Sequence, residues 1–385
     1  MRTHAPPASN AARRRRRASA LALTLTAVFG VAGCASRGPS AAQVPAWRGE
    51  PPPVVETADV RAVTPEMTAW LERYVAPYEG ASTRRYLLAL GLGPAGAHGF
   101  RYEASRTRTA AETFRARSGN CISHAHLLVA LGRAAGLDVH YERIEAEPEW
   151  TEREDAYLVG NHVVAAFRTA QGTYLADPAG MDLTPQTPRR RLDDAEALAL
   201  HHNNLAAQAL LDAGDLPLAY AHAAKAVALA PVLADPWVNL GVVLARHGQA
   251  NGAERAYRAA LAADGANLSA MSNLYGLYRA QGRTEDADRM RARVEWPRRQ
   301  NPYHLLRLAG EAEREGRLAE HRELVEEAAL RKDTDPRVQF ALARARWLTG
   351  DARGARRALE AARSLAPPGF DAAWEPPPAV DSTSP

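Results

Sequence analysis

Hydrophobic positions in the second half of the chain, from about 195 to 368, recur with the spacing of amphipathic helices. A glycine returns at a constant interval, at Gly214, Gly248, Gly282, Gly316 and Gly350. An interval of about 34 residues is typical of a repeated helix–turn–helix unit, with the glycine at the tight turn between the two helices. The pattern therefore predicts five helix pairs, with an unrelated helical bundle as the alternative.

The second of these repeats carries the most informative side chains. They are Trp237, Leu240, Gly241, Gly248, Ala253, Tyr257 and Ala260. This pattern resembles the tetratricopeptide repeat family, although the last two repeats depart from it. The resemblance implies an all-α solenoid over 195–368, with a concave groove that binds a protein or peptide ligand. His201 and His202, at the start of this array, are expected to face solvent.

The pattern differs between 60 and 190, where helical and strand-like stretches alternate. Ser118, Gly119 and Asn120 predict a turn, and Cys121 to Ala135 predicts a helix that Gly136 ends. One side of this helix carries the apolar side chains of Ile122, Ala125, Leu128, Leu131 and Ala135. Cys121 then occupies the first helical turn, where the unpaired amides and the helix dipole favour a thiolate.

Two strands are expected after this helix, at 157–168 and 174–178. If they form a hairpin with a loop at 169–172, Arg168 pairs with Thr173. His162 and Asp177 then become diagonal neighbours on one face of the sheet, within reach of a hydrogen bond. A slip of one residue in this register would separate them.

A cysteine at a helix start, a strand histidine and an aspartate on the paired strand resemble the transglutaminase-like superfamily. The resemblance covers roughly 85 to 185 and implies an α+β fold of the papain/transglutaminase type over 60–190. It implies that Cys121 is the nucleophile, His162 the general base and acid, and Asp177 the residue that orients the imidazole. The amide of Cys121 would supply one oxyanion donor, and Asn120 is a weak candidate for the second.

Each residue of this triad also has a simpler interpretation. Cys121 could be a small buried side chain, His162 a structural strand histidine, and Asp177 the start of a turn before Pro178. His124 and His126 diverge by about 200° on a helix, so they do not predict a metal site; His124 could instead line the site. The sequence contains no cofactor motif, no zinc cysteine set and no nucleic-acid signature.

The segment 1–33 has the features of an export signal. Arg13 to Arg17 precede the apolar run 18–31, and Val31-Ala32-Gly33-Cys34 resembles a bacterial lipobox. The resemblance implies cleavage before Cys34 and acylation of that cysteine, with an ordinary secretory signal or a signal anchor as alternatives. Without this segment the chain has 42 basic and 44 acidic residues, so the basic pI does not indicate nucleic-acid binding.

The remaining segments complete the expected organisation. Residues 34–58 are rich in proline and alanine and predict a tether to the membrane, and 369–385 predict a disordered tail. By resemblance, Ala35 favours the outer membrane, with the protein facing the periplasm. The expected function is a membrane-anchored cysteine enzyme that hydrolyses or transfers amide bonds through a thioester on an envelope protein or peptide. A non-catalytic scaffold or assembly lipoprotein is the alternative.

Overall fold

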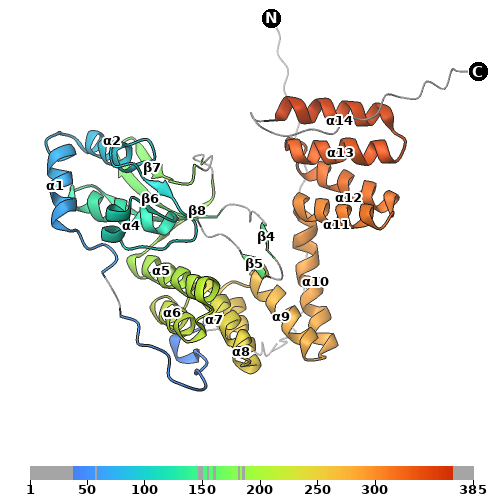
Figure 1. The fold of residues 1–385 in the computed structure, drawn as a ribbon, viewed down its shortest axis with the longest axis horizontal. Coiled ribbons are helices and arrows are strands. Elements are labelled where there is room, and N and C mark those ends of the chain that lie inside the picture. Colours follow the sequence, from blue (N-terminus) through green and yellow to red (C-terminus); the bar gives the residue numbers. More distant parts are fainter. Residues whose placement is uncertain are drawn as a thin grey trace, which may run out of the picture. The chain divides into compact units, whose positions relative to one another are not determined.

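The computed structural model describes residues 38–56, 59–145, 151–153, 156–158, 162–180, 183 and 187–366. A region with a small sheet comes first, and a run of paired helices begins at Asp194 (Figure 1). No helix in the described part of the chain combines the length and apolar character needed to cross a membrane. The expected signal peptide, the acylated Cys34 and the tail at 369–385 lie outside the described residues.

The first region is built around a four-stranded antiparallel sheet with the strand order β7-β6-β3-β8. These strands are β3 (Val139–Ile144), β6 (His162–Thr169), β7 (Gly172–Ala176) and β8 (Arg189–Leu192). Two short pairs accompany the sheet: β1 (Arg101–Tyr102) with β2 (Ser118–Gly119), and β4 (Thr151–Arg153) with β5 (Ala156–Leu158). The expected strand over 157–168 is therefore divided, because β5 pairs with β4 and not with β7.

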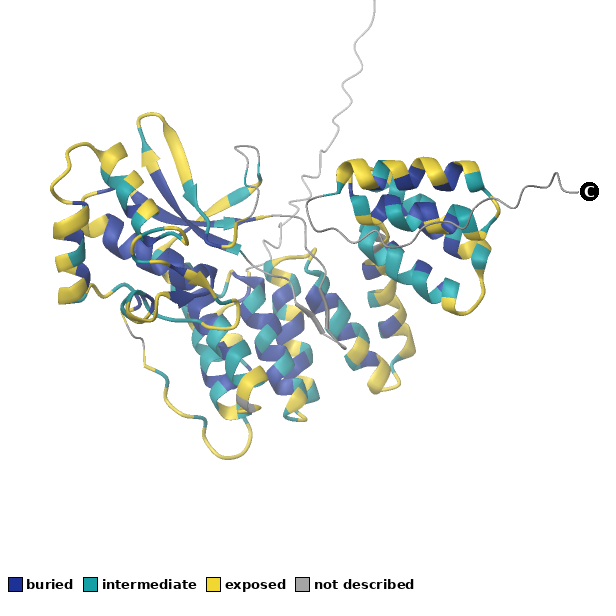
Figure 2. Cartoon of the chain, turned by 45° about the horizontal axis from the view of Figure 1, so that its top comes forward, coloured by how far each residue is buried: buried dark blue, intermediate teal, exposed yellow. Residues whose placement is uncertain are grey.

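The helices of this region are α1 (Pro65–Tyr74), α2 (Ala81–Leu92), α3 (Ala110–Ala116) and α4 (Cys121–Ala134). Helix α4 packs on β3 and β6 and is buried on all sides from Cys121 to Gly132 (Figure 2). The single buried side expected from the sequence is therefore an underestimate, since Ser123, His124 and His126 are buried on this helix as well. Close packing explains Gly132, where a β-carbon would lie 2.8 Å from Val139 Cγ1.

The repeat region contains five successive helix pairs. They are α5 (Asp194–Gln208) with α6 (Leu216–Leu229), α7 (Ala234–Arg246) with α8 (Ala250–Ala263), α9 (Leu268–Ala280) with α10 (Thr284–Gln300), α11 (Pro302–Arg314) with α12 (Leu318–Arg331), and α13 (Pro336–Leu348) with α14 (Ala352–Leu365). One turn of π-helix, η2 (Ala209–Ala213), extends α5. The five predicted pairs and the solenoid class are confirmed.

The periodic glycines lie between the two helices of each pair, as expected. The φ angles of Gly214, Gly248, Gly282, Gly316 and Gly350 run from 63° to 86°. No atom lies within 4 Å of a β-carbon built at these positions. Glycine is therefore favoured by the left-handed backbone and not by a shortage of space.

Gly241, within α7, is required for a different reason. A β-carbon there would overlap the ring of Tyr257 on α8. We expect Gly241→Ala to destabilise the protein by about 1–2 kcal/mol, because overpacking outweighs the gain in helix propensity. Urea unfolding would measure this. Gly276→Ala on α9 is the matched control, since open space surrounds Gly276, and that variant should be neutral or more stable. Equal effects in both variants would contradict the packing argument.

The first repeat shares a hydrophobic core with the sheet region. Leu128 of α4, Tyr141 of β3 and Leu200 of α5 belong to one buried cluster, which extends to Ala226 and Leu233. A second core joins the first three helix pairs around Trp237. A third, separate core lies within the last two pairs. The sheet region and the first repeat are therefore packed as one body.

The expectation that His201 and His202 face solvent is wrong. His201 and His202 are only 5% and 3% exposed. Helices α4 and α6 pack on α5 and cover these two side chains. Residues 39–48, within the segment expected to be a tether, contact the repeats. The Trp47 ring lies 3.8 Å from that of His247, and Tyr220 Oη donates to the Pro45 carbonyl at 2.8 Å.

Candidate active site

Cys121 is the first residue of α4, and the residues before it fix that position. A β-carbon at Gly119, at the end of β2, would lie 2.6 Å from Ser123 Cβ, so this position has no room for a larger residue. Asn120 Oδ1 accepts hydrogen bonds from Ser123 N and Ser123 Oγ, at 3.1 and 2.7 Å. Asn120 therefore caps the helix. The turn predicted at Ser118, Gly119 and Asn120 is wrong, because Ser118 and Gly119 form strand β2 and pair with β1.

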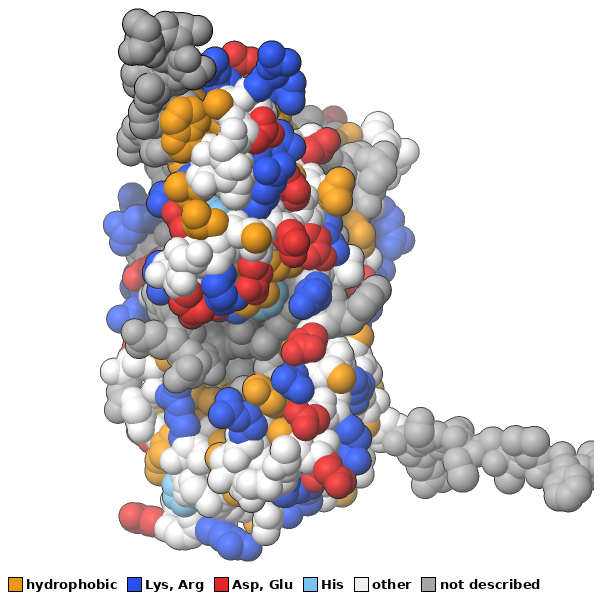
Figure 3. Space-filling model, turned by 90° about the vertical axis from the view of Figure 1, so that its right-hand side faces the viewer, with side chains coloured by type: hydrophobic (Ala, Val, Ile, Leu, Met, Phe, Trp, Pro, Cys, Tyr) orange, Lys and Arg blue, Asp and Glu red, His pale blue; other side chains and the backbone are white. Residues whose placement is uncertain are grey.

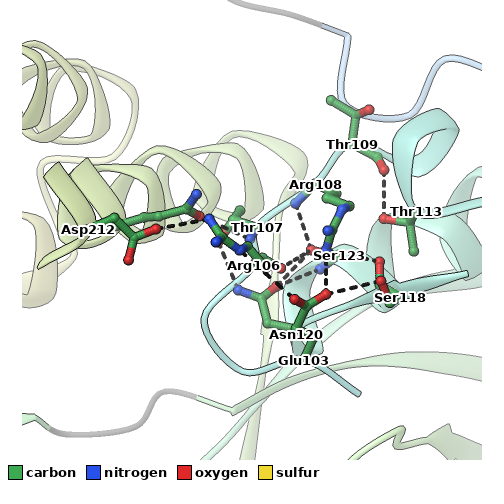
Figure 4. Close-up of polar contacts among 11 residues, drawn as sticks. Glu103, Arg106, Thr107, Arg108, Thr109, Thr113, Ser118, Asn120, Ser123 and Asp212 are labelled. Atoms are coloured by element: carbon green, nitrogen blue, oxygen red, sulfur yellow. Dashed lines mark hydrogen bonds and ion pairs between the residues drawn. The ribbon is translucent and has the colours of Figure 1, made fainter. Parts of the chain in front are cut away.

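Figure 4 shows a polar network that connects Ser118, Asn120 and Ser123 with the segment from Glu103 to Arg108. Asn120 Nδ2 donates to Thr107 Oγ1 at 2.8 Å, and Ser123 Oγ accepts from Arg108 N at 2.8 Å. Glu103 accepts from Ser118 Oγ and Arg108 Nη1, at 3.0 and 3.1 Å. Asn120 therefore has a structural role, with one of its two Nδ2 hydrogens bonded to Thr107.

The structure brings the other two predicted residues together. His162 Nε2 lies 2.6 Å from Asp177 Oδ1, and the side chains are only 11% and 8% exposed. The same carboxylate accepts from Ala179 N at 2.9 Å, so Asp177 also forms the turn that the simpler interpretation expected. The hairpin register is as predicted, since Arg168 pairs with Thr173, but the loop is shorter because Thr169 also pairs with Gly172.

His162 also contacts the cysteine. Burial acts to lower the pKa of His162, but hydrogen bonds to the side chains of Asp177 and Cys121, together with their charges, outweigh it and raise the pKa to about 9. The imidazole is therefore charged at neutral pH. With Nε2 bonded to Asp177, Nδ1 is the ring atom left to face the buried Cys121. The side chains of Cys121, His162 and Asp177 are thus connected by hydrogen bonds.

Tyr102 was not singled out from the sequence, yet it belongs to this site. Burial and the charges of Cys121 and Asp177 raise the pKa of Tyr102 to about 12. Its hydroxyl therefore stays protonated and can donate a hydrogen bond beside the cysteine. The parallel pairing of β1 with β2, just before Cys121, positions Tyr102 here. Two-residue strands have no recognisable periodicity, so the sequence contained no signal for this placement.

Cys121 opens onto a cavity of about 380 Å³. Tyr102, Thr107 and Asn120 line it from the sheet region, and Asn203 and Asn239 line it from the repeats. These two asparagines were also missed from the sequence, because their approach to Cys121 depends on how the repeats pack on the first region.

The histidines of α4 lie behind the site. His124 is 3% exposed, and burial lowers its pKa to about 4; its ring packs 4.4 Å from that of Phe100. His126 Nδ1 lies 2.8 Å from the Tyr141 hydroxyl. Neither lines the cavity. Within the described ranges, no group of three or more potential ligand side chains is arranged to hold a metal ion.

Comparison with known proteins supports the assignment of the first region. Residues 97–177 match the model of the transglutaminase-like superfamily. The chain therefore contains a transglutaminase-like domain, in the stretch that holds Cys121, His162 and Asp177. Comparison with curated proteins gives no match.

Several solved structures are similar to part of this chain. PilF of Pseudomonas aeruginosa is 20% identical, with 46% of this chain and 79% of PilF covered and a TM-score of 0.29. MamA is 16% identical, with 43% and 95% covered and a TM-score of 0.24. YrrB, described as a TPR protein with an unusual peptide-binding site, is 17% identical, with 44% and 88% covered and a TM-score of 0.25. At such TM-scores these similarities add nothing to what the repeat spacing and the helix pairs already show.

Proposed function

We propose that this protein is an envelope lipoprotein that cleaves or transfers amide bonds through a thioester on Cys121. The observation that carries the proposal is the connected chain from Cys121 through His162 to Asp177, with 2.6 Å between His162 Nε2 and Asp177 Oδ1. A structural histidine alone would not need a carboxylate on one side and the thiol of a helix-start cysteine on the other.

Each residue has a defined step in this chemistry. The Cys121 thiolate attacks the amide carbonyl, and the backbone amide of Cys121 and the Tyr102 hydroxyl donate to the resulting oxyanion. The His162 imidazolium gives its proton to the nitrogen as the carbon–nitrogen bond breaks. Water or a second amine then attacks the thioester and loses a proton to His162 as the sulfur leaves. Asp177 orients the ring and stabilises its charge throughout.

The experiment that tests this proposal measures the rate at which iodoacetamide alkylates Cys121 between pH 5 and 9. Protein starting at residue 35, which keeps every described residue, is compared with its His162→Ala variant. Rapid alkylation near neutral pH that depends on His162 is the expected result. Slow alkylation that is unchanged by the substitution would instead favour the non-catalytic scaffold.

The lipid anchor is the second part of the proposal, and the lipobox-like sequence before Cys34 supports it. We expect radiolabelled palmitate to be incorporated when the full chain is expressed in a bacterial host. Cys34→Ser should abolish the label and release the protein from the membrane fraction, while Cys121→Ser should leave both unchanged. Membrane association that persists without the label would contradict lipid anchoring. Fractionation of the two membranes would test the proposed outer-membrane location.

The partner is proposed to be a protein or peptide, because paired-helix arrays of this class present a groove to polypeptide segments. The face shown in Figure 3 has arginine, lysine and acidic side chains interspersed, with no large patch of one sign. That distribution does not favour a polyanion as the partner on this face.

A further inference from the structure

We propose that the first repeats form one wall of the catalytic cleft and hold an extended, uncharged polypeptide segment against Cys121. The inference rests on the function proposed above, because it takes Cys121 as the reacting group. It goes further in assigning the chemical class of substrate and two specificity residues, Asn203 and Asn239.

The cavity at Cys121 has two walls of different origin. Tyr102, Thr107 and Cys121 come from the transglutaminase-like domain, whereas Asn203, Asn239 and Ser269 come from α5, α7 and α9. Its volume of about 380 Å³ falls within the usual range for ligand sites. A substrate bound at the thiol would therefore contact the inner helices of the first three repeats.

The two walls are held together by specific contacts as well as by the shared core. Arg106 Nη1 lies 2.9 Å from Asp212 Oδ2, and Arg143 Nη1 lies 2.8 Å from Asp235 Oδ2. The backbone amide of Thr107, which neighbours this cleft, donates to Gln208 Oε1 at 3.3 Å. These links fix the distance between the cysteine and the repeat wall, so the cavity is preformed.

The repeat wall is rich in carboxamides and has little net charge. Both of its carboxylates, Asp212 and Asp235, are paired with arginines. Asn239 Nδ2 donates to Asn203 Oδ1 at 2.8 Å, which orients both side chains. Asn203 Nδ2 and Asn239 Oδ1 take no part in that hydrogen bond, so the pair can present both a donor and an acceptor to a substrate. A peptide unit offers one acceptor and one donor in return, so the wall matches the backbone of an extended segment.

The rim of the same cavity provides an apolar contact. Leu211 lies in the π-helical turn η2 and is 58% exposed. A π-turn displaces its residues from the regular helix surface and is frequent at functional sites. Leu211 can therefore cover a substrate side chain beside the backbone held by the two asparagines.

The experiment compares two probes on the full chain, purified in detergent. One is iodoacetamide, and the other is an acetylated tetrapeptide of alanine and glycine with a C-terminal acyloxymethyl ketone. Alkylation of Cys121 is measured by mass spectrometry for the wild type, Asn203→Ala and Asn239→Ala. The control is Asn251→Ala, an exposed asparagine on α8 outside the cavity.

The quantity of interest is the ratio of the peptide-probe rate to the iodoacetamide rate. We expect this ratio to fall about threefold to tenfold in each cavity variant, the effect of losing one hydrogen bond, and to stay constant in Asn251→Ala. Should Asn203→Ala fail to fold, Asn239→Ala decides alone.

A constant ratio in the folded cavity variants would overturn the inference, even if iodoacetamide labelling still depended on His162. A loss of that His162 dependence would instead count against the proposed function. A tetrapeptide probe carrying two glutamates should react more slowly than the uncharged one. An equal or faster reaction would contradict the assigned substrate class.

Discussion

At pH 6, replacing His162 with alanine is expected to slow the alkylation of Cys121 by about a hundredfold. An unassisted thiol with an ordinary pKa near 8.5 would be about 0.3% ionised at that pH. The pKa of the His162 imidazole is raised to about 9, so the ring is charged at pH 6 and places a positive charge beside Cys121 in the wild type. Above pH 9 the difference should shrink, because the imidazole loses its proton and the variant thiol ionises unaided.

The matched control is His140→Ala on β3 of the same sheet. His140 Nε2 lies 3.1 Å from Glu142 Oε1 and is 3% exposed, so it reproduces a buried histidine–carboxylate pair without a cysteine. Its removal should leave the alkylation rate unchanged. Asp177→Ala should give an intermediate rate, because His162 keeps its position but loses the carboxylate. A similar loss in the His140 variant would point to general destabilisation.

Mild acid is expected to destabilise the protein through a second group of histidines. The rings of His126 and His201 lie 5.3 Å apart, and His202 Nδ1 lies 3.0 Å from His222 Nδ1. Burial lowers the pKa of His201 to about 4, and burial with the neighbouring histidines and Lys225 lowers that of His202 to about 3. Burial, His201 and Arg61 also lower the pKa of His126.

The sign of the effect follows from these shifts. Each histidine has a lower pKa in the folded protein than its value near 6.5 in the unfolded chain, so folding favours the neutral form. The associated stability is fully present above pH 6.5 and is lost as the pH falls through about 4. For His201 alone the loss is on the order of 3 kcal/mol.

Urea unfolding at several pH values between 7.5 and 4 would measure this loss. His201→Gln cannot take up a proton and should flatten the dependence of the unfolding free energy on pH. His304→Gln, at a histidine of α11 that is outside the buried cluster, should leave that dependence unchanged. A wild-type free energy that stays constant down to pH 4 would contradict the prediction.

The sequence predicted the features that depend on local structure. The turn glycines recur at a constant interval because each turn needs a positive φ, a constraint within a few neighbouring residues. The pairing of His162 with Asp177 was predictable because the short hairpin of β6 and β7 determines its own register. The catalytic roles of these residues remain predictions until labelling is measured.

Features that depend on distant packing were not predictable. His201 and His202 belong to a helix whose outer face is covered by α4 and α6, and nothing in that segment indicates which neighbours it will have. Residues 39–48 have the composition of a tether, but Pro45 and Trp47 contact Tyr220 on the repeats. The tryptophan was the available signal, because a free tether gains nothing from such a side chain.

The core shared by the sheet region and the first repeat limits how this chain can be divided. Composition suggests a domain border near residue 193. Truncation there would remove Leu200 from the core and expose Tyr141 and Leu128 to solvent. The transglutaminase-like domain therefore cannot be excised or exchanged at that border. Only the last two helix pairs, which have a core of their own, meet the requirement for a removable module.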